Sequence, residues 1–379
     1  MSHAASVEAL PARVEVIVIG GGIAGCIAAN TLAAGGAKVI GLEARHRTGD
    51  GFSGRALGRV SLGLDESPFR LASALGDKRA HELYAFSSRN RERLTGYAES
   101  NAGGTWLATR PQESEDIIKS HQALERIGVE ASLWSAEQCA QESGYASAGP
   151  GWHDPSAFCV NPKATIQNLA HGVQWHCNKR VVAIEDEAHG LSIRVEDGAA
   201  VHTEFVVVAA GTDTGRLLPS FSDCFTAVRE SWMSTPAKPN APIRPFRGGH
   251  GYMRWRDRND GTRVLGGLRW AVPHMGVGDT DDSAVADKVR MRLQQILSGP
   301  MGLALNGSVQ AWSAIACHSC DNLPIIGAIP GHGRKLICAG WGGADWAFAA
   351  EGAFQIAQSI LTGQRSAIPS FLSPARLLE

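Results

Sequence analysis

The sequence predicts an α/β fold with a nucleotide-binding domain of the Rossmann type, and three observations lead to that prediction. A β-branched run of strand length, Val14–Ile19, passes directly into a glycine-rich turn and then an apolar helix. A second buried run, Phe205–Ala210, also ends at a glycine. Residues 334–361 read as a strand, a glycine turn and a helix. The nucleotide-binding domain is therefore expected to draw on both ends of the chain.

Length and composition fit a globular protein of two domains. The chain has 379 residues, 44% of them hydrophobic and 19% charged, with a formal net charge of −1. Because the chain carries no net positive charge, neither nucleic acid nor an anionic membrane is expected as a partner. The first 13 residues lack the features of a signal peptide, and eight cysteines are spread along the chain. We therefore expect a cytoplasmic protein with reduced thiols.

The turn after the first strand matches the pattern G-x-G-x-x-G at Gly20, Gly22 and Gly25. These glycines allow a tight turn, a close approach of the backbone to a pyrophosphate, and close helix–strand packing. The helix that follows directs its positive N-terminal end at the phosphates. A second strand, Lys38–Leu42, ends at Glu43, 18 residues past Gly25, where a carboxylate binds ribose hydroxyls. Together these features predict a dinucleotide site rather than a glycine-rich turn of another α/β protein.

The choice of dinucleotide depends on Glu43 and on the segment after it. A carboxylate at this position disfavours a 2′-phosphate, so FAD or NAD is favoured over NADP. Residues 45–64 form a polar, glycine-rich loop of the kind that runs along a flavin, where a classical dehydrogenase would continue with a helix. FAD is therefore the expected cofactor, and an NAD-dependent enzyme is the less favoured alternative.

Taken together, several motifs resemble the FAD-dependent superfamily of D-amino-acid oxidase, glycine oxidase and sarcosine oxidase. The resemblance covers nearly the whole chain, and its motifs are specific only in combination. They are "VIVIGGGIAG", Glu43, "SGR" at 53–55, "VVVAAGTDTGRLLP" at 206–219, "GYMRWR" at 251–256, "VLGGLRW" at 264–270, "DNLPIIG" at 321–327 and "AGWGGADWAFAAEG" at 339–352.

This resemblance implies a discontinuous, Rossmann-like FAD-binding domain and a second, α+β domain whose antiparallel sheet covers the flavin ring. We expect the FAD-binding domain to comprise residues 1–80, 146–218 and 305–379. The substrate domain would comprise residues 81–145 and 219–304.

The resemblance also implies a set of cofactor-binding residues. Ser53, Gly54 and Arg55 should lie near the pyrophosphate or the ring, and the backbone of Val182 near the adenine. The glycine turn at 340–343 should direct backbone N–H groups at the flavin, where they support the negative charge of its reduced form. The expected cofactor-binding residues are Gly20, Gly22, Gly25, Glu43, Ser53, Gly54, Arg55, Val182, Gly211, Gly340, Trp341, Gly342, Gly343 and Cys317.

The stretch "ACHSCDNLPIIG", residues 316–327, contains two cysteines three residues apart, Cys317 and Cys320. Four interpretations are open: half a zinc site, a redox dithiol, a covalent flavin link, or thiols that only line the pocket. Only one Cys-x-x-Cys half is present, and it does not begin a helix, which disfavours zinc and a thioredoxin-type centre. We expect non-covalent FAD, with a covalent link at Cys317 as the alternative. No metal site is expected.

Two substrate anchors of amino-acid-oxidising relatives are absent. The position of a carboxylate-binding arginine is Ala316 here, and that of a lysine is Ala347. This argues against simple glycine or sarcosine as the substrate and favours a biosynthetic or catabolic amine, or a tethered or modified amino acid.

Four other residues are candidates for the substrate site. Arg269 aligns with a lysine that promotes the reaction with oxygen. Tyr252 and Arg254 alternate along a strand, so Arg254 is a candidate replacement for the missing clamp. Asp345 either faces the pocket, where it attracts a cationic amine, or caps the following helix. Each of the four also has an ordinary structural interpretation.

We therefore predict an FAD-dependent oxidoreductase that oxidises the C–N bond of an amine or amino acid by hydride transfer to flavin N5. The product is an imine, and O2 is the expected acceptor, which gives hydrogen peroxide. The alternatives are a flavin dehydrogenase that passes electrons to a quinone or protein, and a non-catalytic FAD-binding subunit of an oxidase complex. The sequence does not fix the substrate or the oligomeric state.

Overall fold

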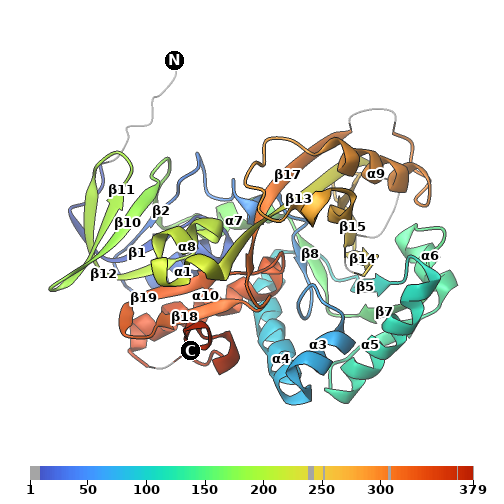
Figure 1. The fold of residues 1–379 in the computed structure, drawn as a ribbon, viewed down its shortest axis with the longest axis horizontal. Helices are drawn as coiled ribbons and strands as arrows, with labels where there is room; N and C mark the ends of the chain where they lie inside the picture. The colour runs from blue at the N-terminus through green and yellow to red at the C-terminus, as the bar shows by residue number, and fades with distance from the viewer. Residues whose placement is uncertain (1–8, 238–242, 251, 306–308, 365, 379) are drawn as a thin grey trace.

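The computed structural model describes residues 9–237, 243–250, 252–305, 309–364 and 366–378. Two large sheets lie side by side, with helices packed around both (Figure 1). The predicted α/β fold with a nucleotide-binding domain and a second domain built on a sheet is confirmed. No helix in the described parts of the chain is long and apolar enough to cross a membrane.

The first sheet has eight strands in the described chain. Six follow the order β10-β11-β12-β1-β2-β9, and β19 pairs with both β12 and β18. β1 is parallel to β2 and β12, and β12 is parallel to β19, so their carboxyl ends meet at one edge. The strands of this sheet are β1 (Arg13–Ile19), β2 (Val39–Leu42), β9 (Gln174–His176), β10 (Val181–Glu187), β11 (Gly190–Val195), β12 (Ala200–Val208), β18 (Ile325–Ile329) and β19 (His332–Ala339).

The predicted strands and helices of this domain are present with shifted ends. β1 carries Val16, Ile17 and Val18, which are fully buried because both faces of the sheet are covered. α1 (Ile23–Ala34) follows it, and α10 (Asp345–Thr362) from the C-terminal part of the chain packs against α1. Contacts with α10, with α7 (Pro162–Ala170) and with the sheet explain why α1 is apolar on every side.

The second sheet also has eight strands among the described residues, in the order β17-β13-β16-β15-β14-β5-β7-β6. Most of its neighbouring strands are antiparallel. Its strands are β5 (Gly104–Leu107), β6 (Ser132–Trp134), β7 (Gly151–Asp154), β13 (Phe225–Pro236), β14 (Phe246–Gly248), β15 (Met253–Asp257), β16 (Thr262–Gly267) and β17 (Gln310–Ser319).

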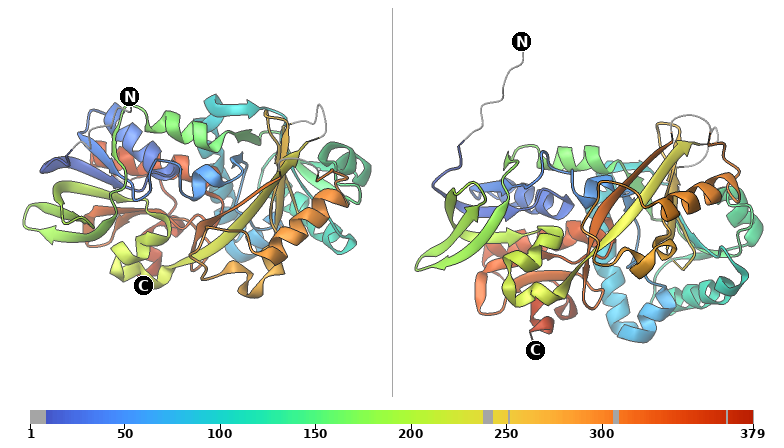
Figure 2. Two further views of the ribbon diagram at one scale, coloured as in Figure 1. Left: turned by 90° about the horizontal axis from the view of Figure 1, so that it is seen from above. Right: turned by 45° about the horizontal axis from the view of Figure 1, so that its top comes forward.

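The long strands β13 and β17 run side by side at the junction between the two halves of the molecule (Figure 2). Strands β7 and β17 come from segments that we expected in the FAD-binding domain, yet both pair in the second sheet. We therefore propose that the boundaries of the two domains lie after β7 and after β17.

The other elements connect or cover these sheets. The predicted loop at 45–64 contains a short helix and a short strand, α2 and β3. A small third sheet has the order β3-β8-β4. These strands and the remaining α-helices are β3 (Arg59–Val60), β4 (Ala98–Ser100), β8 (Phe158–Val160), α2 (Phe52–Arg55), α3 (Pro68–Leu75), α4 (Asp77–Leu94), α5 (Ser114–Arg126), α6 (Ala136–Ser143), α7 (Pro162–Ala170), α8 (Thr214–Leu217) and α9 (Asp287–Ser298).

Candidate cofactor and substrate site

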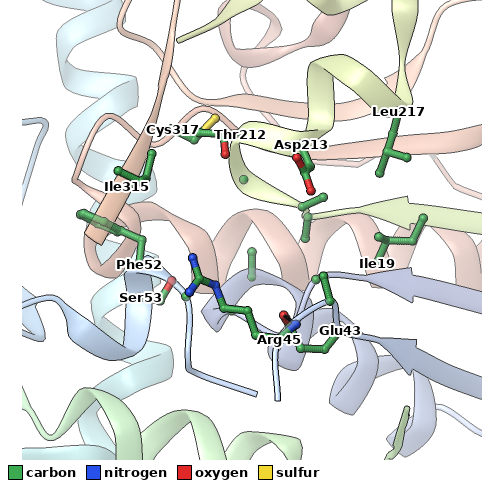
Figure 3. Close-up of a pocket in the computed structure, with 18 of the residues that line it drawn as sticks. Ile19, Glu43, Arg45, Phe52, Ser53, Thr212, Asp213, Leu217, Ile315 and Cys317 are labelled. Atoms are coloured by element: carbon green, nitrogen blue, oxygen red, sulfur yellow. Dashed lines mark hydrogen bonds between the residues drawn. The ribbon is translucent and has the colours of Figure 1, made fainter. Parts of the chain in front are cut away.

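A cleft with a volume of about 350 Å³ opens where the parallel strands of the first sheet end (Figure 3). Residues from β1, β2 and the end of β12 line one side, and Ile315 and Cys317 of β17 line the other. The position is the usual one for a ligand of an open α/β sheet, beyond the carboxyl ends of the strands. Expected residues that line the cleft are Gly20, Gly22, Glu43, Ser53, Gly211, Cys317, Trp341, Gly343 and Asp345.

The glycine turn after β1 requires glycine for steric reasons. Gly20 has φ +104°, and a Cβ there would lie 2.3 Å from the carbonyl oxygen of Ala209. A Cβ on Gly25 would lie 1.8 Å from the carbonyl oxygen of Gly20, which is the close helix–strand packing expected of the third glycine. Gly22 is the N-cap of α1 and gives the helix no side-chain cap. Because the first-turn N–H groups receive no side-chain cap, this helix end fits a pyrophosphate.

Glu43 is held in place by two backbone groups at the end of β2. Its carboxylate accepts hydrogen bonds from the N–H of Gly21 and the N–H of Arg45, each at 2.6 Å. The side chain lines the cleft and is only 9% exposed. This fixed acceptor fits the ribose hydroxyls of a dinucleotide, as the sequence predicted.

Several expected cofactor residues lie just behind the lining. Gly54 packs so closely on Gly49 that a Cβ would lie 1.9 Å from its carbonyl oxygen, so its role is in backbone packing. Val182 follows Val181, which does line the cleft. The Gly342 N–H donates to the carbonyl of Cys317 at 2.9 Å, so it ties the glycine turn to β17.

Arg55 does not line the cleft but joins a segment that crosses beside it. Its guanidinium lies 2.9 Å from Asp282 and donates to the carbonyl of Ser313. Asp282 also pairs with Arg45 at 2.8 Å. We call residues 277–286 the strap, because this segment of the second domain is held by two arginines of the first and contributes Thr280 to the cleft.

A buried group of charged residues lies next to the cleft, and we call it the arginine cluster. Arg254 forms ion pairs with Asp65 and, at 3.5 Å, with Glu230. Arg269 pairs with the same Glu230 at 3.2 Å. Four arginines against two carboxylates leave an excess of two positive charges. The members of the cluster are Arg59, Arg247, Arg254, Arg269, Asp65 and Glu230.

The four predicted substrate-site residues are brought together around this cluster. Arg254 and Arg269 share Glu230, and the Arg269 guanidinium lies 5.9 Å from the ring centre of Tyr252. Asp345 and Arg254 line a small hollow that continues from the cleft. The hollow shares Phe52 with the cleft, so the cofactor cleft and the arginine cluster meet.

The burial of these groups shifts their protonation. Burial raises the pKa of Asp345 to about 6, although the nearby Ser53 hydroxyl and the Trp346 N–H oppose the shift. Burial also opposes the ionisation of Asp65, but Arg247, Arg254 and Arg59 outweigh it and hold the pKa of Asp65 well below its usual range. Asp65 is therefore a permanent anion in the cluster, while Asp345 titrates near neutrality.

Asp345 is the first residue of α10 and is 2% exposed. The N-cap position belongs to Ala344, and no side chain caps the helix. Within the described residues, neither carboxylate oxygen of Asp345 has a hydrogen-bond partner at good distance and angle. This geometry favours the pocket-facing interpretation of Asp345 over a capping role.

Beside the cluster, β17 presents small residues and a histidine. Ala314 is the cross-strand partner of Glu230, and Ala316 is the partner of Val228. Two residues further along, His318 lies against the glycine turn, where a Cβ on Gly342 would be 3.4 Å from its ring. Burial and Arg269 lower the pKa of His318, so its imidazole is neutral at neutral pH.

Cys317 lines the cleft, whereas Cys320 lies outside it and is exposed. Burial raises the pKa of the Cys317 thiol to about 12. A thiol with this pKa is protonated at neutral pH and is a poor nucleophile.

Sequence reasoning missed the charged partners of the site. Asp65 and Glu230 belong to no motif, and their partners come from strands far away in the sequence. A single acidic residue in β13 gives only a weak signal of a buried site, because alternate residues of a strand commonly face solvent. Arg45 could have been predicted as a site residue, because it follows Glu43 by two residues, and it lines the same cleft.

A dinucleotide cleft that opens onto charged groups of a separate antiparallel sheet is the arrangement of a cofactor-dependent oxidoreductase. The chain belongs to the FAD dependent oxidoreductase family, whose sequence model matches residues 15–359. The resemblance seen in the sequence is thereby confirmed, and the protein is an FAD-dependent oxidoreductase.

Curated relatives include proteins named tRNA 5-methylaminomethyl-2-thiouridine biosynthesis bifunctional protein MnmC. The one from Thiobacillus denitrificans is 27% identical over 364 residues, which cover 90% of this chain and 56% of that protein. A probable oxidoreductase, OrdL, from Haemophilus influenzae is 26% identical over 207 residues, covering 51% of this chain and 48% of that protein. The chain thus spans about half the length of the curated relatives it matches.

Solved structures show the same fold at low sequence identity. Glycine oxidase from Bacillus cereus superposes with a TM-score of 0.78 at 17% identity, covering 93% of this chain and 96% of that one. L-proline dehydrogenase from P. horikoshii superposes with a TM-score of 0.77 at 17% identity, covering 97% of this chain and 98% of that one.

Proposed function

We propose that the protein oxidises a C–N bond of an amine or amino acid that also carries an anionic group. One observation carries this proposal: the cleft that fits FAD continues, at Asp345, into a buried cluster that keeps an excess of positive charge, with four arginines against three carboxylates when Asp345 is ionised. When bound, FAD supplies the acceptor for the hydride that leaves the carbon next to nitrogen, and O2 is the proposed final acceptor.

The chain's own residues would then bind and orient the substrate. Arg254 pairs with Asp65 and Glu230, and Arg269 pairs with Glu230, so both guanidiniums keep N–H groups that an acid group of the substrate would accept from. Glu230 holds both arginines in position. Asp345, whose pKa is raised to about 6, has a charge that depends on pH near neutrality and lies where it attracts the substrate amine.

The substrate is proposed to be larger than glycine or sarcosine. The residues at the positions of the two usual anchors, Ala316 and Ala347, are buried and uncharged. With alanines at 314 and 316 opposite Glu230 and Val228, β17 places no charged side chain beside the cluster at these two positions. A modified or tethered amino acid, held by other groups, fits this arrangement better than a small free one.

Anaerobic mixing of the purified FAD-loaded protein with a panel of amines tests the reaction. The expected result is bleaching of the flavin absorbance by secondary amines with an acid group, followed by recovery of the colour in air with formation of peroxide. Bleaching that persists in air would indicate the alternative of a dehydrogenase with another acceptor. A flavin that no amine bleaches would contradict catalysis and favour a non-catalytic subunit.

We propose that FAD is bound non-covalently, because the Cys317 thiol is protonated at neutral pH. After acid precipitation, the yellow colour is expected in the supernatant. Colour that stays with the pellet would contradict this and point to a covalent link, which Cys317→Ala would remove.

A second candidate substrate is an amine carried on tRNA, suggested by the names of the curated relatives. The formal net charge of −1 gives no general affinity for nucleic acid, so this candidate needs a local contact. Oxidation of an alkylaminomethyl-uridine in tRNA, but not of the free nucleoside, would favour it over a small-molecule substrate.

A further inference from the structure

Cys320, the second cysteine of the Cys-x-x-Cys stretch, faces a cysteine from a distant part of the sequence. Phe225 of β13 pairs with Ser319 of β17, so the next residues outward, Cys224 and Cys320, are opposite one another. The N–H of Cys320 donates to the carbonyl of Cys224 at 3.0 Å. Besides burial, Cys320 is among the groups that raise the pKa of the Cys224 thiol, which is expected of thiols that lie close together.

This geometry suits a disulfide. Residues directly opposite on antiparallel strands have Cβ atoms about 4.5–5.5 Å apart, and a disulfide needs about 3.5–4.5 Å. The difference is small, and Cys224 and Cys320 lie beyond the last paired residues of β13 and β17, where the backbone is not held on both sides.

Exposure also singles out this pair. Of the eight cysteines, all within the described residues, Cys320 is the exposed one, and Cys224 is partly exposed. Cys317 is buried on the cleft side and lies three residues away along an extended strand. Cys320 lies in the turn directly after β17, and its N–H bonds to the carbonyl of Cys224, so Cys224 is the cysteine that it faces.

We propose that Cys224 and Cys320 form a reversible disulfide when the protein meets hydrogen peroxide. The Cys320 thiol attacks the peroxide, an S–O bond forms as the O–O bond breaks, and one water leaves. The Cys224 thiol then attacks the resulting sulfenic acid, an S–S bond replaces the S–O bond, and a second water leaves. Two thiols are oxidised by two electrons, and one peroxide is reduced to two waters.

The roles within the pair follow from their environments. Burial and the neighbouring Cys320 raise the pKa of the Cys224 thiol, which makes Cys224 the partner that reacts second. The oxidase reaction proposed above would release the same oxidant near this thiol. The pairing itself does not depend on that reaction, because added peroxide provides the oxidant.

The disulfide would fix the end of the β13–β17 pair close to the site. The carbonyl of Cys317 accepts a hydrogen bond from the Gly342 N–H. The backbone of His318 forms an isolated antiparallel β-bridge with Trp341 of the glycine turn. Ser319 donates to the carbonyl of Leu323 at 2.7 Å, so the segment after the strand is held as well. Oxidation is therefore expected to stiffen the backbone that carries His318.

The test is thiol titration and peptide mapping of the FAD-loaded protein after treatment with hydrogen peroxide. Under denaturing conditions the free thiols are expected to fall from eight to six per chain, and dithiothreitol is expected to restore them. Digestion with trypsin should yield residues 217–229, which contain Cys224, linked to residues 293–334, and fragmentation of this pair should place the link on Cys320 and not on Cys317. The apparent melting temperature should rise on oxidation.

Cys320→Ser and Cys224→Ser should each abolish the link and the rise in melting temperature, whereas Cys177→Ser, a partly exposed cysteine elsewhere, should keep both. A link between Cys320 and Cys317, or oxidation of Cys320 to sulfinic acid with Cys224 still free, would overturn the proposal. Because these readouts use added peroxide and no amine, failure of the proposed oxidase activity would leave them unchanged.

Discussion

Asp345 is an ionisable group that the protein buries at a cost. Its pKa rises from 3.8 to about 6 on folding, so the folded protein holds this proton more tightly than the unfolded chain. The contribution to stability is therefore favourable below about pH 4 and is lost as the pH rises through 6. A group that destabilises the protein at neutral pH, in a hollow beside the cofactor cleft, is a candidate for function.

Asp345→Asn is therefore expected to stabilise the protein at pH 7.5 by on the order of 3 kcal/mol, because a rise of the pKa from 3.8 to about 6 corresponds to a free energy of that size. The advantage should shrink to well under about 1 kcal/mol near pH 4, where Asp345 is protonated in the folded protein and about half protonated in the unfolded chain. Urea unfolding of the two proteins at both pH values measures it, with the exposed Asp223→Asn as the control. Equal stabilities at pH 7.5 would show that the carboxylate is not buried as described.

Arg269 offers the most accessible guanidinium of the arginine cluster to a substrate. Its side chain is 14% exposed, and it pairs with Glu230 alone, whereas Arg254 is held by two carboxylates. Loss of Arg254 would remove one of the three arginines around Asp65 and one of the two around Glu230, all of them buried or nearly so, and would threaten folding. Arg269 is therefore the better residue for a test of substrate binding.

Arg269→Gln is expected to lower kcat/KM for an anionic amine by about 10–100-fold, because a hydrogen bond to a charged group contributes about 1.5–3 kcal/mol. The loss should be smaller for an uncharged amine. Arg126→Gln is the control, since Arg126 at the end of α5 pairs with the exposed Asp77 at 2.8 Å and lies outside the cleft and the cluster. If both variants behave alike, Arg269 does not contact the substrate.

At the scale of elements, the strap joins the two domains across the cofactor cleft. Gly278 donates to Ala227 of β13, and Ser313 of β17 donates to Ala284, so both ends of the strap are held by the second sheet. Its middle reaches the first domain through Asp282, which binds Arg45 and Arg55. The strap therefore closes the cleft beside Thr280.

Asp282→Asn is expected to weaken FAD binding about tenfold, mainly through faster dissociation. The two ion pairs are partly exposed, and such pairs contribute up to about 1 kcal/mol each. Titration of the apoprotein with FAD, followed by flavin fluorescence, measures the effect, which should diminish at high salt. Asp281→Asn in the same strap is the control, because its carboxylate bonds only locally to the Ser283 N–H. A wild-type affinity for Asp282→Asn would mean that the strap does not retain FAD.

For the whole molecule, the cleft lies between the two sheets, so FAD is expected to stabilise both domains together. Ligand present at about 100 times its Kd adds about 2.7 kcal/mol to the free energy of unfolding. The melting temperature of the apoprotein should therefore rise by several degrees with FAD, as a single transition. NADP, which Glu43 disfavours, is the control ligand. Two transitions, of which FAD shifts only one, would contradict a cleft shared between the domains.

Local sequence signals led to the proposed cofactor half of the site, and the structure places Gly20, Gly22 and Glu43 along one cleft. The glycines at 20, 22 and 25 and the acid at 43 act through backbone geometry and short-range order, which the spacing of residues along one β-α-β unit already encodes. The same logic predicted the glycine turn before α10. The exact contacts of Gly54 and Val182 were not predictable, because they depend on how neighbouring segments pack.

The sequence alone thus determined the family, the fold class and the dinucleotide cradle, because these depend on periodicity and on motifs within short stretches. Only the tertiary structure decided which charges surround Arg254 and Arg269, and which cysteine faces Cys320. Glu230, Asp65 and Cys224 come from separate elements, and antiparallel pairing brings them to their partners. Strand register decides such contacts, and the register follows from the packing of whole sheets.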